Sequence, residues 1–360
     1  MSTYFNGQSL FKQAQIGTTA IYGLAGSGLQ NRYYILSDPG SRPLLAFPEV
    51  VGYDCYTALL GASANALGYL NGQLPHSGID IFTILRGGLN YPIEEAASSC
   101  GIPVRYMHFV SCERIIKNQE ILGLDIRYQK ITPSAGRTVA IGDILATGDT
   151  FRLCISYLVD EFARCGGSIR RIILFTIGGT RAVDLLEELT PQIRDRFPDF
   201  EGFDCFFFEG MFTVYTDHGA SGINTPNIDF GWKGGIVTPD FREYIAAHPD
   251  ALLEKCIIYD GGARRYEIPL HLEEVLDYWN GILERAGAID AGALVREKLG
   301  YDGPLDYQDW QQATCLAASG DLHPLWAAEQ RIMEHPADLA QLAARRIEAI
   351  NQLKIQYETE

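Results

Sequence analysis

Apolar and polar positions along this chain follow two periods, one typical of buried strands and one typical of helices. Short runs of β-branched and aromatic residues predict strands at residues 32–36, 79–85, 104–110, 138–144, 171–177, 203–208 and 212–215. Apolar residues at helical spacing predict helices at residues 53–74, 90–100 and 150–165. Because strands alternate with helices over residues 76–180, we expect an α/β fold whose central parallel sheet is covered on both faces.

The two ends of the chain differ from the middle in residue composition and in the elements they predict. Residues 1–30 are polar and rich in glycine, and the segment from Gly23 to Gly28 is interpreted as a turn because a strand, not a helix, follows it. Residues 112–129 are charged and predict an irregular loop. After a Gly-, Asn-, Thr- and Pro-rich stretch at 217–240, helices are predicted at 272–286, 305–319, 322–335 and 337–357.

These changes in texture divide the chain into an N-terminal extension or hood (1–75), a core (76–215) and a C-terminal hood and mainly helical region (216–360). The last helix, 337–357, is amphipathic. It is either an element of a homodimer interface or a lid packed on its own domain, and the second is favoured.

The net charge of the chain argues against two classes of binding partner. The chain has 360 residues, and Asp and Glu exceed Lys and Arg by enough to give a formal net charge of −16. This balance argues against a nucleic-acid partner or an anionic membrane surface, both of which need a basic face. It does not exclude a small phosphorylated ligand, because backbone amides bind phosphate without a net positive chain.

Cysteine usage and the N-terminus indicate a cytoplasmic protein. The eight cysteines include no Cys-x-x-Cys pair, which argues against a structural zinc site, and we expect them to be reduced and mostly buried. The first fifteen residues are too polar for a signal peptide. No apolar run reaches the ~18 residues that a membrane span needs.

The most informative segment is Thr138-Val-Ala-Ile-Gly-Asp-Ile-Leu-Ala-Thr-Gly-Asp-Thr150. A hydrophobic strand carries Asp143 to its carboxyl end, and a turn of small residues then opens a helix. Small residues let the backbone approach a ligand, and the helix N-terminus adds the positive end of its dipole. Ligands of open α/β sheets lie beyond the carboxyl ends of the strands. The segment therefore predicts a phosphate site.

These residues resemble the phosphoribosyl-pyrophosphate (PRPP) motif of type I phosphoribosyltransferases. Upstream, Ile84-Leu85-Arg86-Gly87-Gly88-Leu89 follows a strand and is similar to the pyrophosphate-binding loop of the same family. The order of elements between the two motifs also agrees with that family, and the resemblance covers about residues 76–180.

The resemblance implies a role for each matching residue. The ligand's 5′-phosphate would lie on the turn formed by Ala146, Thr147, Gly148, Asp149 and Thr150. Asp143 would hold the ribose hydroxyls, directly or through Mg²⁺, and the pyrophosphate would lie against Arg86, Gly87 and Gly88. The charged 112–129 segment matches the position of the family's flexible lid, whose candidate residues are Arg114, Lys117 and Lys130.

Three positions depart from the family pattern. Gly142 stands where the first of two adjacent acids usually lies, so one ribose or metal contact is missing. Asp149 lies in the phosphate turn, where we expect its carboxylate to face solvent. Ala146 takes the place of the Asp that contacts the base in 6-oxopurine enzymes, which argues against a hypoxanthine–guanine acceptor.

The resemblance implies Mg²⁺-dependent transfer of ribose 5-phosphate from PRPP to a small-molecule acceptor, with release of pyrophosphate, as in nucleotide metabolism. Arg86 and Asp143 are the candidate catalytic residues. Trp232 either stacks on the acceptor ring or packs in the hood. Two alternatives stay open: a non-enzymatic PRPP or nucleotide sensor of the same fold, favoured by Gly142, and a hydrolase or lyase acting on a phosphorylated sugar.

Overall fold

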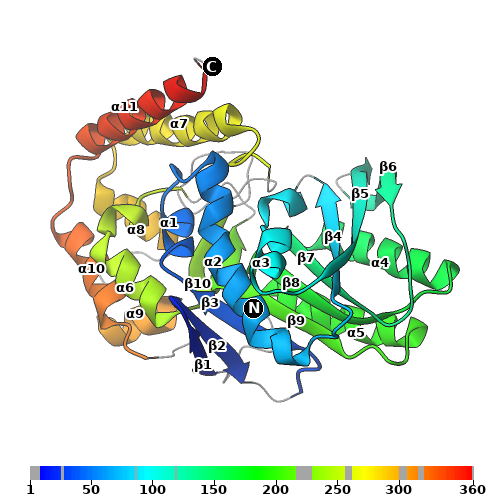
Figure 1. The fold of residues 1–360 in the computed structure, drawn as a ribbon. Coiled ribbons are helices and arrows are strands. Elements are labelled where there is room, and N and C mark those ends of the chain that lie inside the picture. Colours follow the sequence, from blue (N-terminus) through cyan, green and yellow to red (C-terminus); the bar gives the residue numbers. More distant parts are fainter. Residues whose placement is uncertain are drawn as a thin grey trace.

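One large mixed sheet forms the centre of the computed structural model, which describes residues 9–25, 28–85, 87–117, 120–215, 229–255, 262–299, 306–314 and 320–358 (Figure 1). The strands are β1 (Ser9–Ile16), β2 (Thr19–Ala25), β3 (Arg32–Ser37), β4 (Ile79–Leu85), β5 (Val104–Lys117), β6 (Glu120–Lys130), β7 (Arg137–Leu145), β8 (Ile169–Gly179), β9 (Gly202–Tyr215) and β10 (Asp229–Val237). Their order is β1-β2-β3-β9-β8-β7-β4-β5-β6, and β10 pairs with β9.

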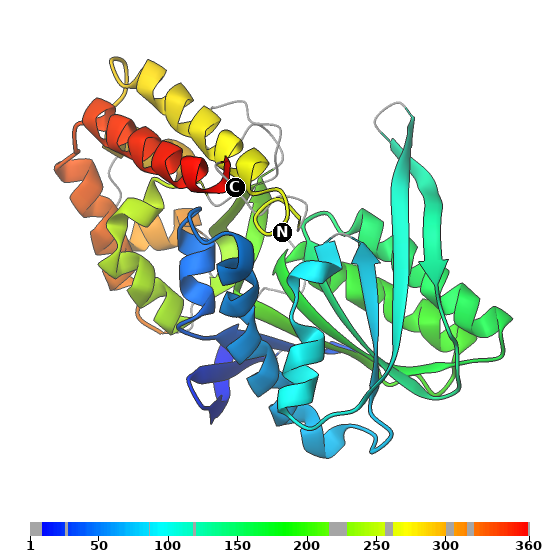
Figure 2. The ribbon, with the colours of Figure 1, turned by 45° about the horizontal axis from the view of Figure 1, so that its top comes forward.

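The middle of this sheet is parallel, which confirms the predicted α/β class. Strands β3, β9, β8, β7, β4 and β5 pair in parallel, while β1, β2, β6 and β10 pair with their neighbours in antiparallel fashion. Helices α2 (Gly52–Leu70) and α3 (Ile93–Ser99) cover one face, and α4 (Asp149–Arg164) and α5 (Arg181–Arg196) cover the other (Figures 1 and 2). Each face has its own hydrophobic core, so alternate residues of β8, such as Phe175 and Leu174, are buried in different cores.

The C-terminal region is helical, as predicted. Its helices are α6 (Pro239–Ala247), α7 (Ile268–Arg285), α8 (Ala291–Leu299), α9 (Tyr307–Thr314), α10 (His323–Glu334) and α11 (Leu339–Glu358). Three of its helices share a separate hydrophobic core, and the other three bury their apolar residues in a core of the central sheet. Helix α11 lies along α7 and buries Leu342 and Ile350 against it (Figure 1). Lys354 donates to Glu273 of α7 at 3.0 Å. The last helix thus packs on its own chain, in line with the favoured alternative.

Three predictions of local structure were wrong. The segment 112–129 was expected to be an irregular loop, but its described residues, 112–117 and 120–129, belong to strands β5 and β6, which pair as a long hairpin that projects from the sheet (Figure 2). Residues 203–215, expected to be two strands, are the single strand β9. Residues 23–25, placed in a turn, end strand β2. The elements that no sequence pattern predicted are β1, β2, β10, α1 (Ser41–Ala46), α5, α6 and α8.

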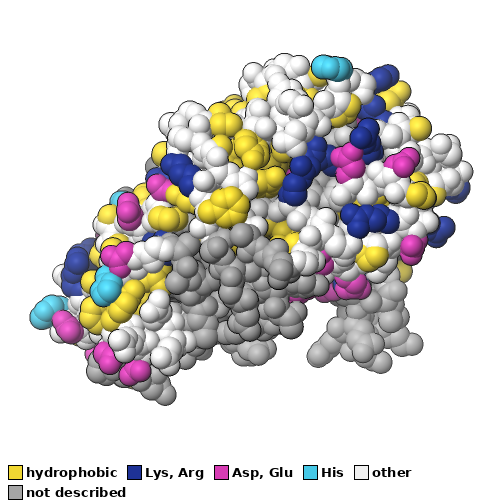
Figure 3. Space-filling view, turned by 90° about the horizontal axis from the view of Figure 1, so that it is seen from below, with side chains coloured by type: hydrophobic (Ala, Val, Ile, Leu, Met, Phe, Trp, Pro, Cys, Tyr) yellow, Lys and Arg dark blue, Asp and Glu magenta, His cyan; other side chains and the backbone are white. Residues whose placement is uncertain are grey.

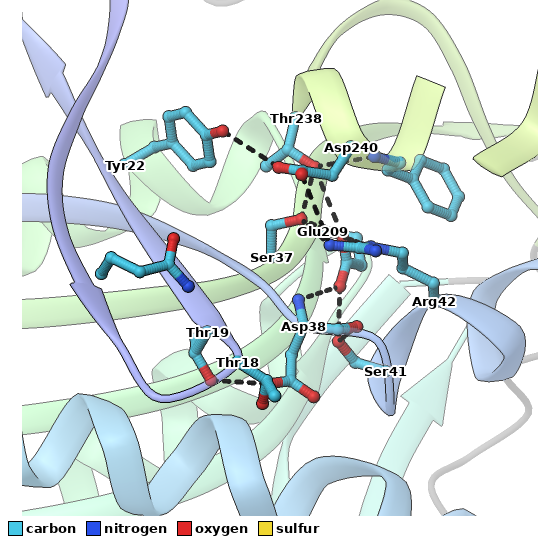
Figure 4. Close-up of polar contacts among 12 residues, drawn as sticks. Thr18, Thr19, Tyr22, Ser37, Asp38, Ser41, Arg42, Glu209, Thr238 and Asp240 are labelled. Carbon is cyan, nitrogen blue, oxygen red and sulfur yellow. Dashed lines mark hydrogen bonds and ion pairs between the residues drawn. The ribbon is translucent and has the colours of Figure 1, made fainter. Parts of the chain in front are cut away.

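A buried carboxylate explains why the predicted break in β9 is not a strand end. Glu209 has φ +62°, the backbone of a turn, yet it lies inside β9 and its side chain is fully buried (Figure 4). Its Oε1 accepts hydrogen bonds from Asp38 N at 2.7 Å and Ser41 Oγ at 2.6 Å, and its Oε2 accepts from Ser37 Oγ at 2.8 Å. Thr238 Oγ1 also donates to Oε2, at 3.3 Å.

This cluster links three segments of the chain. Ser37, Asp38 and Ser41 join the end of β3 to α1 (Ser41–Ala46), and Thr238 is the N-cap of α6. Burial raises the pKa of Glu209 to about 7, although its hydrogen bonds and the nearby Arg42 oppose the shift. The N-terminal extension and the C-terminal region are therefore fixed to the same point of the central sheet.

The surface carries both signs of charge. On the face shown in Figure 3, Lys and Arg side chains lie among Asp and Glu side chains over part of the surface. Arg170 at the start of β8 pairs with Glu201 at 2.6 Å.

None of the six described cysteines forms a disulfide, and three of them are buried. In the described part of the chain, no helix is long and apolar enough to cross a bilayer.

The raised pKa of Glu209 predicts a pH dependence of stability. A carboxyl group whose pKa rises on folding binds its proton more tightly in the native state, so its contribution is complete below pH ~4.5 and is lost as the pH rises through about 7. We expect this group to lower the free energy of unfolding by up to ~3 kcal/mol between pH 5 and 8. Glu209→Gln should therefore flatten the dependence of the unfolding temperature on pH. An equally steep dependence in the variant would contradict the shift.

Candidate functional site

The sequence-predicted phosphate turn lies at the carboxyl edge of the parallel sheet. Asp143 is close to the end of β7, and the chain then turns through residues 146–148 before α4 begins at Asp149. Gly148 is the N-cap of α4 with φ +83°, a conformation that L side chains rarely adopt. The first amides of a helix point outward without intrahelical partners, so this junction can bind an anion.

Helix α5 presses on this turn from one side. A Cβ atom on Gly148 would lie 2.5 Å from Leu185 Cδ2, so a side chain at this position requires the leucine to move. Thr147 and Asp149 are exposed, while Ala146 and Thr150 are partly buried. The exposed carboxylate of Asp149 agrees with the expectation that it faces solvent.

The second predicted loop packs on β7, the strand that leads into the phosphate turn. A short 3-10 helix, η3 (Gly87–Asn90), follows β4, which pairs with β7. A Cβ atom on Gly88 would lie 3.1 Å from Gly142 O and 3.1 Å from Thr83 Cγ2, so only glycine leaves this approach unhindered. The loop after β4 therefore packs against the backbone of β7, one residue from Asp143.

Tyr91 explains the missing acid. A Cβ atom on Gly142 would lie 2.3 Å from both Cβ and Cγ of Tyr91. The tyrosine is buried, and its hydroxyl accepts a hydrogen bond from Ile177 N of β8 at 3.1 Å. The phenol ring thus lies where a side chain at position 142 would have to go, so it excludes a carboxylate there.

Asp143 is not a helix cap. The N-cap of α4 is Gly148, and Asp143 lies within β7, half-buried, with its Oδ1 accepting from Ile144 N at 2.9 Å. A half-buried carboxylate at the ligand edge of a parallel sheet fits a role in binding rather than one in starting a helix.

The sequence analysis missed one segment at this edge. Strand β8 pairs in parallel with β7, with Leu145 opposite Gly178, so the junction of β8 with α5 lies beside the phosphate turn. Arg181 is the first residue of α5 and is exposed. The available signal was a Gly-Gly-Thr-Arg sequence after a strand, which repeats the strand–glycine–helix pattern of the predicted phosphate turn.

The other predicted site residues are placed less completely. Arg86 lies outside the residues that the structure describes, as do the side chains of Arg114, Lys117 and Trp232. Arg114 and Lys117 belong to β5 and Trp232 to β10, while Lys130 is exposed at the end of β6. The lid candidates therefore lie on the β5–β6 hairpin rather than on an irregular loop.

The donor set fits a magnesium ion that is shared with a ligand. Among the described residues, no group of three or more His, Cys, Asp and Glu side chains could hold a metal. Mg²⁺ is often bound by one or two carboxylates together with substrate phosphates. Asp143 could supply one such carboxylate, and the Tyr91 ring excludes a second at position 142.

Comparisons with known proteins find similarity in structure only. No protein-family model and no curated protein sequence matches the chain. A hypoxanthine phosphoribosyltransferase from Staphylococcus aureus is 14% identical, matching 44% of this chain and 77% of that one with a TM-score of 0.28. The hypoxanthine-guanine phosphoribosyltransferase of L. donovani is 12% identical (40% and 79% covered, TM-score 0.30).

A purine phosphoribosyltransferase from Pyrococcus horikoshii Ot3 is 18% identical, matching 34% of this chain and 71% of that one with a TM-score of 0.25. Solved phosphoribosyltransferases thus match part of the chain. TM-scores this low do not define a shared fold, so any function must be supported by the strand order and loops of the chain itself.

Replacing Gly148 tests the phosphate turn. Gly148→Ala adds a Cβ in a left-handed backbone and against Leu185, so we expect loss of PRPP binding in calorimetry. Gly166→Ala is the matched control, because Gly166 has φ +73°, nothing within 4 Å of its Cβ position, and lies beyond the other end of α4. Both variants should lose some stability. Equal PRPP affinity in both would contradict a site at the turn.

Replacing Gly142 tests whether the Tyr91 ring excludes a side chain at position 142. Gly142→Ala should lower the free energy of unfolding by about 1–3 kcal/mol, the usual range for overpacking. In a Tyr91→Gly background the same change should cost clearly less, because the atoms it would meet are gone. Urea unfolding of the four proteins measures this coupling, and additive effects would argue that the two positions do not compete for space.

Proposed function

We propose that this chain transfers the ribose 5-phosphate unit of PRPP to a small-molecule acceptor and releases pyrophosphate. The observation that carries the proposal is the close approach of the loop after β4 to strand β7, where Gly88 packs on the carbonyl of Gly142, one residue before Asp143. It supports the proposal because the candidate diphosphate loop, Asp143 and the N-terminus of α4, which could bind a phosphate, follow neighbouring strands at one sheet edge.

The proposed reaction requires the two loops and Asp143 to hold different groups of PRPP. Loss of pyrophosphate from C1 of the ribose creates an oxocarbenium-like centre, as in glycoside cleavage. The turn at 146–150 would hold the 5′-phosphate, and Arg86 with the glycines at 87 and 88 would bind the leaving diphosphate. Asp143 would orient the ribose. Magnesium, when bound with PRPP, supplies charge neutralisation for the diphosphate.

Water must be kept from the reacting centre, because it would capture the cation in place of the acceptor. The β5–β6 hairpin begins on the strand next to β4 and carries the lid candidates Arg114, Lys117 and Lys130. Trp232 on β10 is the candidate for contact with the acceptor. Ala146 in place of an acid supports an acceptor other than hypoxanthine or guanine.

A second candidate function is a PRPP or nucleotide sensor without turnover, and Tyr91 is the observation that favours it. The ring excludes a second carboxylate beside Asp143, which weakens the hold on ribose or metal while leaving the phosphate turn intact. Pyrophosphate release separates the candidates. An enzyme releases it from PRPP only with an acceptor present, a sensor binds PRPP without release, and a hydrolase consumes PRPP alone.

Asp143 provides the sharpest test of the enzymatic role. Asp143→Asn should lower turnover or PRPP affinity at least tenfold, since a hydrogen bond to a charged group is worth ~1.5–3 kcal/mol. Asp160→Asn is the control, because Asp160 is an exposed carboxylate on α4 that pairs with Arg196 at 3.3 Å. Neither change should alter the unfolding temperature much. Asp143→Asn with intact binding and turnover would remove the residue from the site.

A further inference from the structure

An arginine of the C-terminal region reaches the candidate diphosphate loop. Residues 262–267 form a turn just before α7, closed by hydrogen bonds from Arg265 N and Tyr266 N to Gly262 O at 3.2 and 2.7 Å. Arg264 in this turn is buried, and its guanidinium donates to Leu44 O of α1 at 2.5 Å. The turn is therefore fixed to the N-terminal extension, and its neighbouring side chains have a defined position.

The Arg265 side chain is held against the loop by aromatic rings. Its Cζ lies 3.6 Å from the centre of the Tyr56 ring and 4.9 Å from that of Tyr266. Its guanidinium donates to the carbonyl of Leu89, and the Tyr266 hydroxyl donates to the same oxygen at 3.0 Å. Leu89 follows Gly88 directly, so the cation is fixed one residue from the predicted diphosphate contact.

Two features of this arrangement suit an anion. A ring stacked on its face leaves the edge of a guanidinium, where all five N–H groups lie, to bind a ligand. The hydrogen bond to Leu89 uses one part of that edge. In the described part of the chain no carboxylate forms an ion pair with Arg265, although the protein carries a net charge of −16.

We propose that Arg265 binds the diphosphate group of the ligand, as a cation that the C-terminal region adds to the loop at 87–89. The inference deepens the proposed function and rests on it for the identity of the whole ligand. Guanidinium groups bind phosphate oxygens in a bidentate manner. Because Tyr56 and Tyr266 already restrict the side chain, little conformational entropy remains to be lost on binding.

Tyr56 acts as a positioning residue in this arrangement. It lies on α2, and burial together with the nearby Glu95 of α3 raises the pKa of its hydroxyl. Its ring face, not its hydroxyl, contacts Arg265. Tyr56→Phe should therefore preserve diphosphate binding, and Tyr56→Leu should weaken it in the same direction as loss of Arg265.

Calorimetry with three probes tests the proposal: inorganic pyrophosphate, ribose 5-phosphate and PRPP, each with Mg²⁺. Arg265→Gln should weaken the binding of pyrophosphate and PRPP at least tenfold and leave that of ribose 5-phosphate unchanged. Arg265→Lys should weaken the binding of pyrophosphate and PRPP by an intermediate amount, because the lysine ammonium keeps the charge but lacks the planar set of N–H donors of a guanidinium. Arg196→Gln is the matched control, because Arg196 is an exposed arginine at the end of α5.

Two results overturn the proposal. Unchanged pyrophosphate affinity in Arg265→Gln shows that the arginine only fastens the C-terminal turn to Leu89, and so does an equal loss for all three probes. Other results bear on the proposed transferase function. If the wild-type protein binds pyrophosphate through Arg265 but binds neither PRPP nor ribose 5-phosphate, the diphosphate site is supported and the proposed transferase function is contradicted. A wild type that binds none of the probes would overturn both.

Discussion

The carboxyl edge of the sheet depends on the packing of Tyr91 against Gly142. Tyr91 follows η3 directly, its ring covers the backbone of β7, and its hydroxyl accepts from Ile177 N of β8. One buried side chain thus connects the ends of three neighbouring strands. It fixes the distance between the loop after β4 and the turn after β7, which are the two places where a phosphorylated ligand would be held.

This packing also sets the charge of the site. Burial raises the pKa of Tyr91, and the nearby Asp143 raises it further, so the phenol is neutral and takes no part in balancing a metal or a sugar cation. A carboxylate at position 142 and the ring at position 91 exclude each other. The negative charge of a bound diphosphate would therefore be met by cations such as Arg265 and by magnesium bound through a single carboxylate, rather than by metal held between paired acids.

Those parts of the fold whose packing follows a simple period could be predicted from sequence. The apolar run of β4 was located without error, and β7 and α4 were placed to within about a residue, because each is buried on both faces or on one stripe. The two glycine loops were predicted from the same local pattern. The division at residues 75 and 215 stays a prediction, although the sheet runs on through β3, β2 and β1.

What could not be predicted depends on contacts between distant residues. The β5–β6 ribbon pairs with itself, and its charges form pairs along the hairpin, such as Arg127 with Glu113 at 2.8 Å, so the segment lacks the apolar alternation of a covered strand. The role of Tyr91 could not be inferred, since nothing in the sequence links position 91 to position 142. The same holds for Arg265, which meets Leu89 only because the chain returns to this edge 176 residues later.

Glu209 explains why the returning segments are held firmly at that edge. A non-glycine residue at positive φ costs of the order of 1–3 kcal/mol, which persists only where the surroundings over-determine it. Here four donors from β3, α1 and the start of α6 converge on one buried carboxylate, and each would lose its partner if the strand relaxed. The C-terminal region is therefore anchored within β9 through Thr238, which binds Glu209, and at the loop after β4 through Arg265. Because β8 and β7 lie between these two strands in the sheet, both anchors flank the segment that carries Asp143.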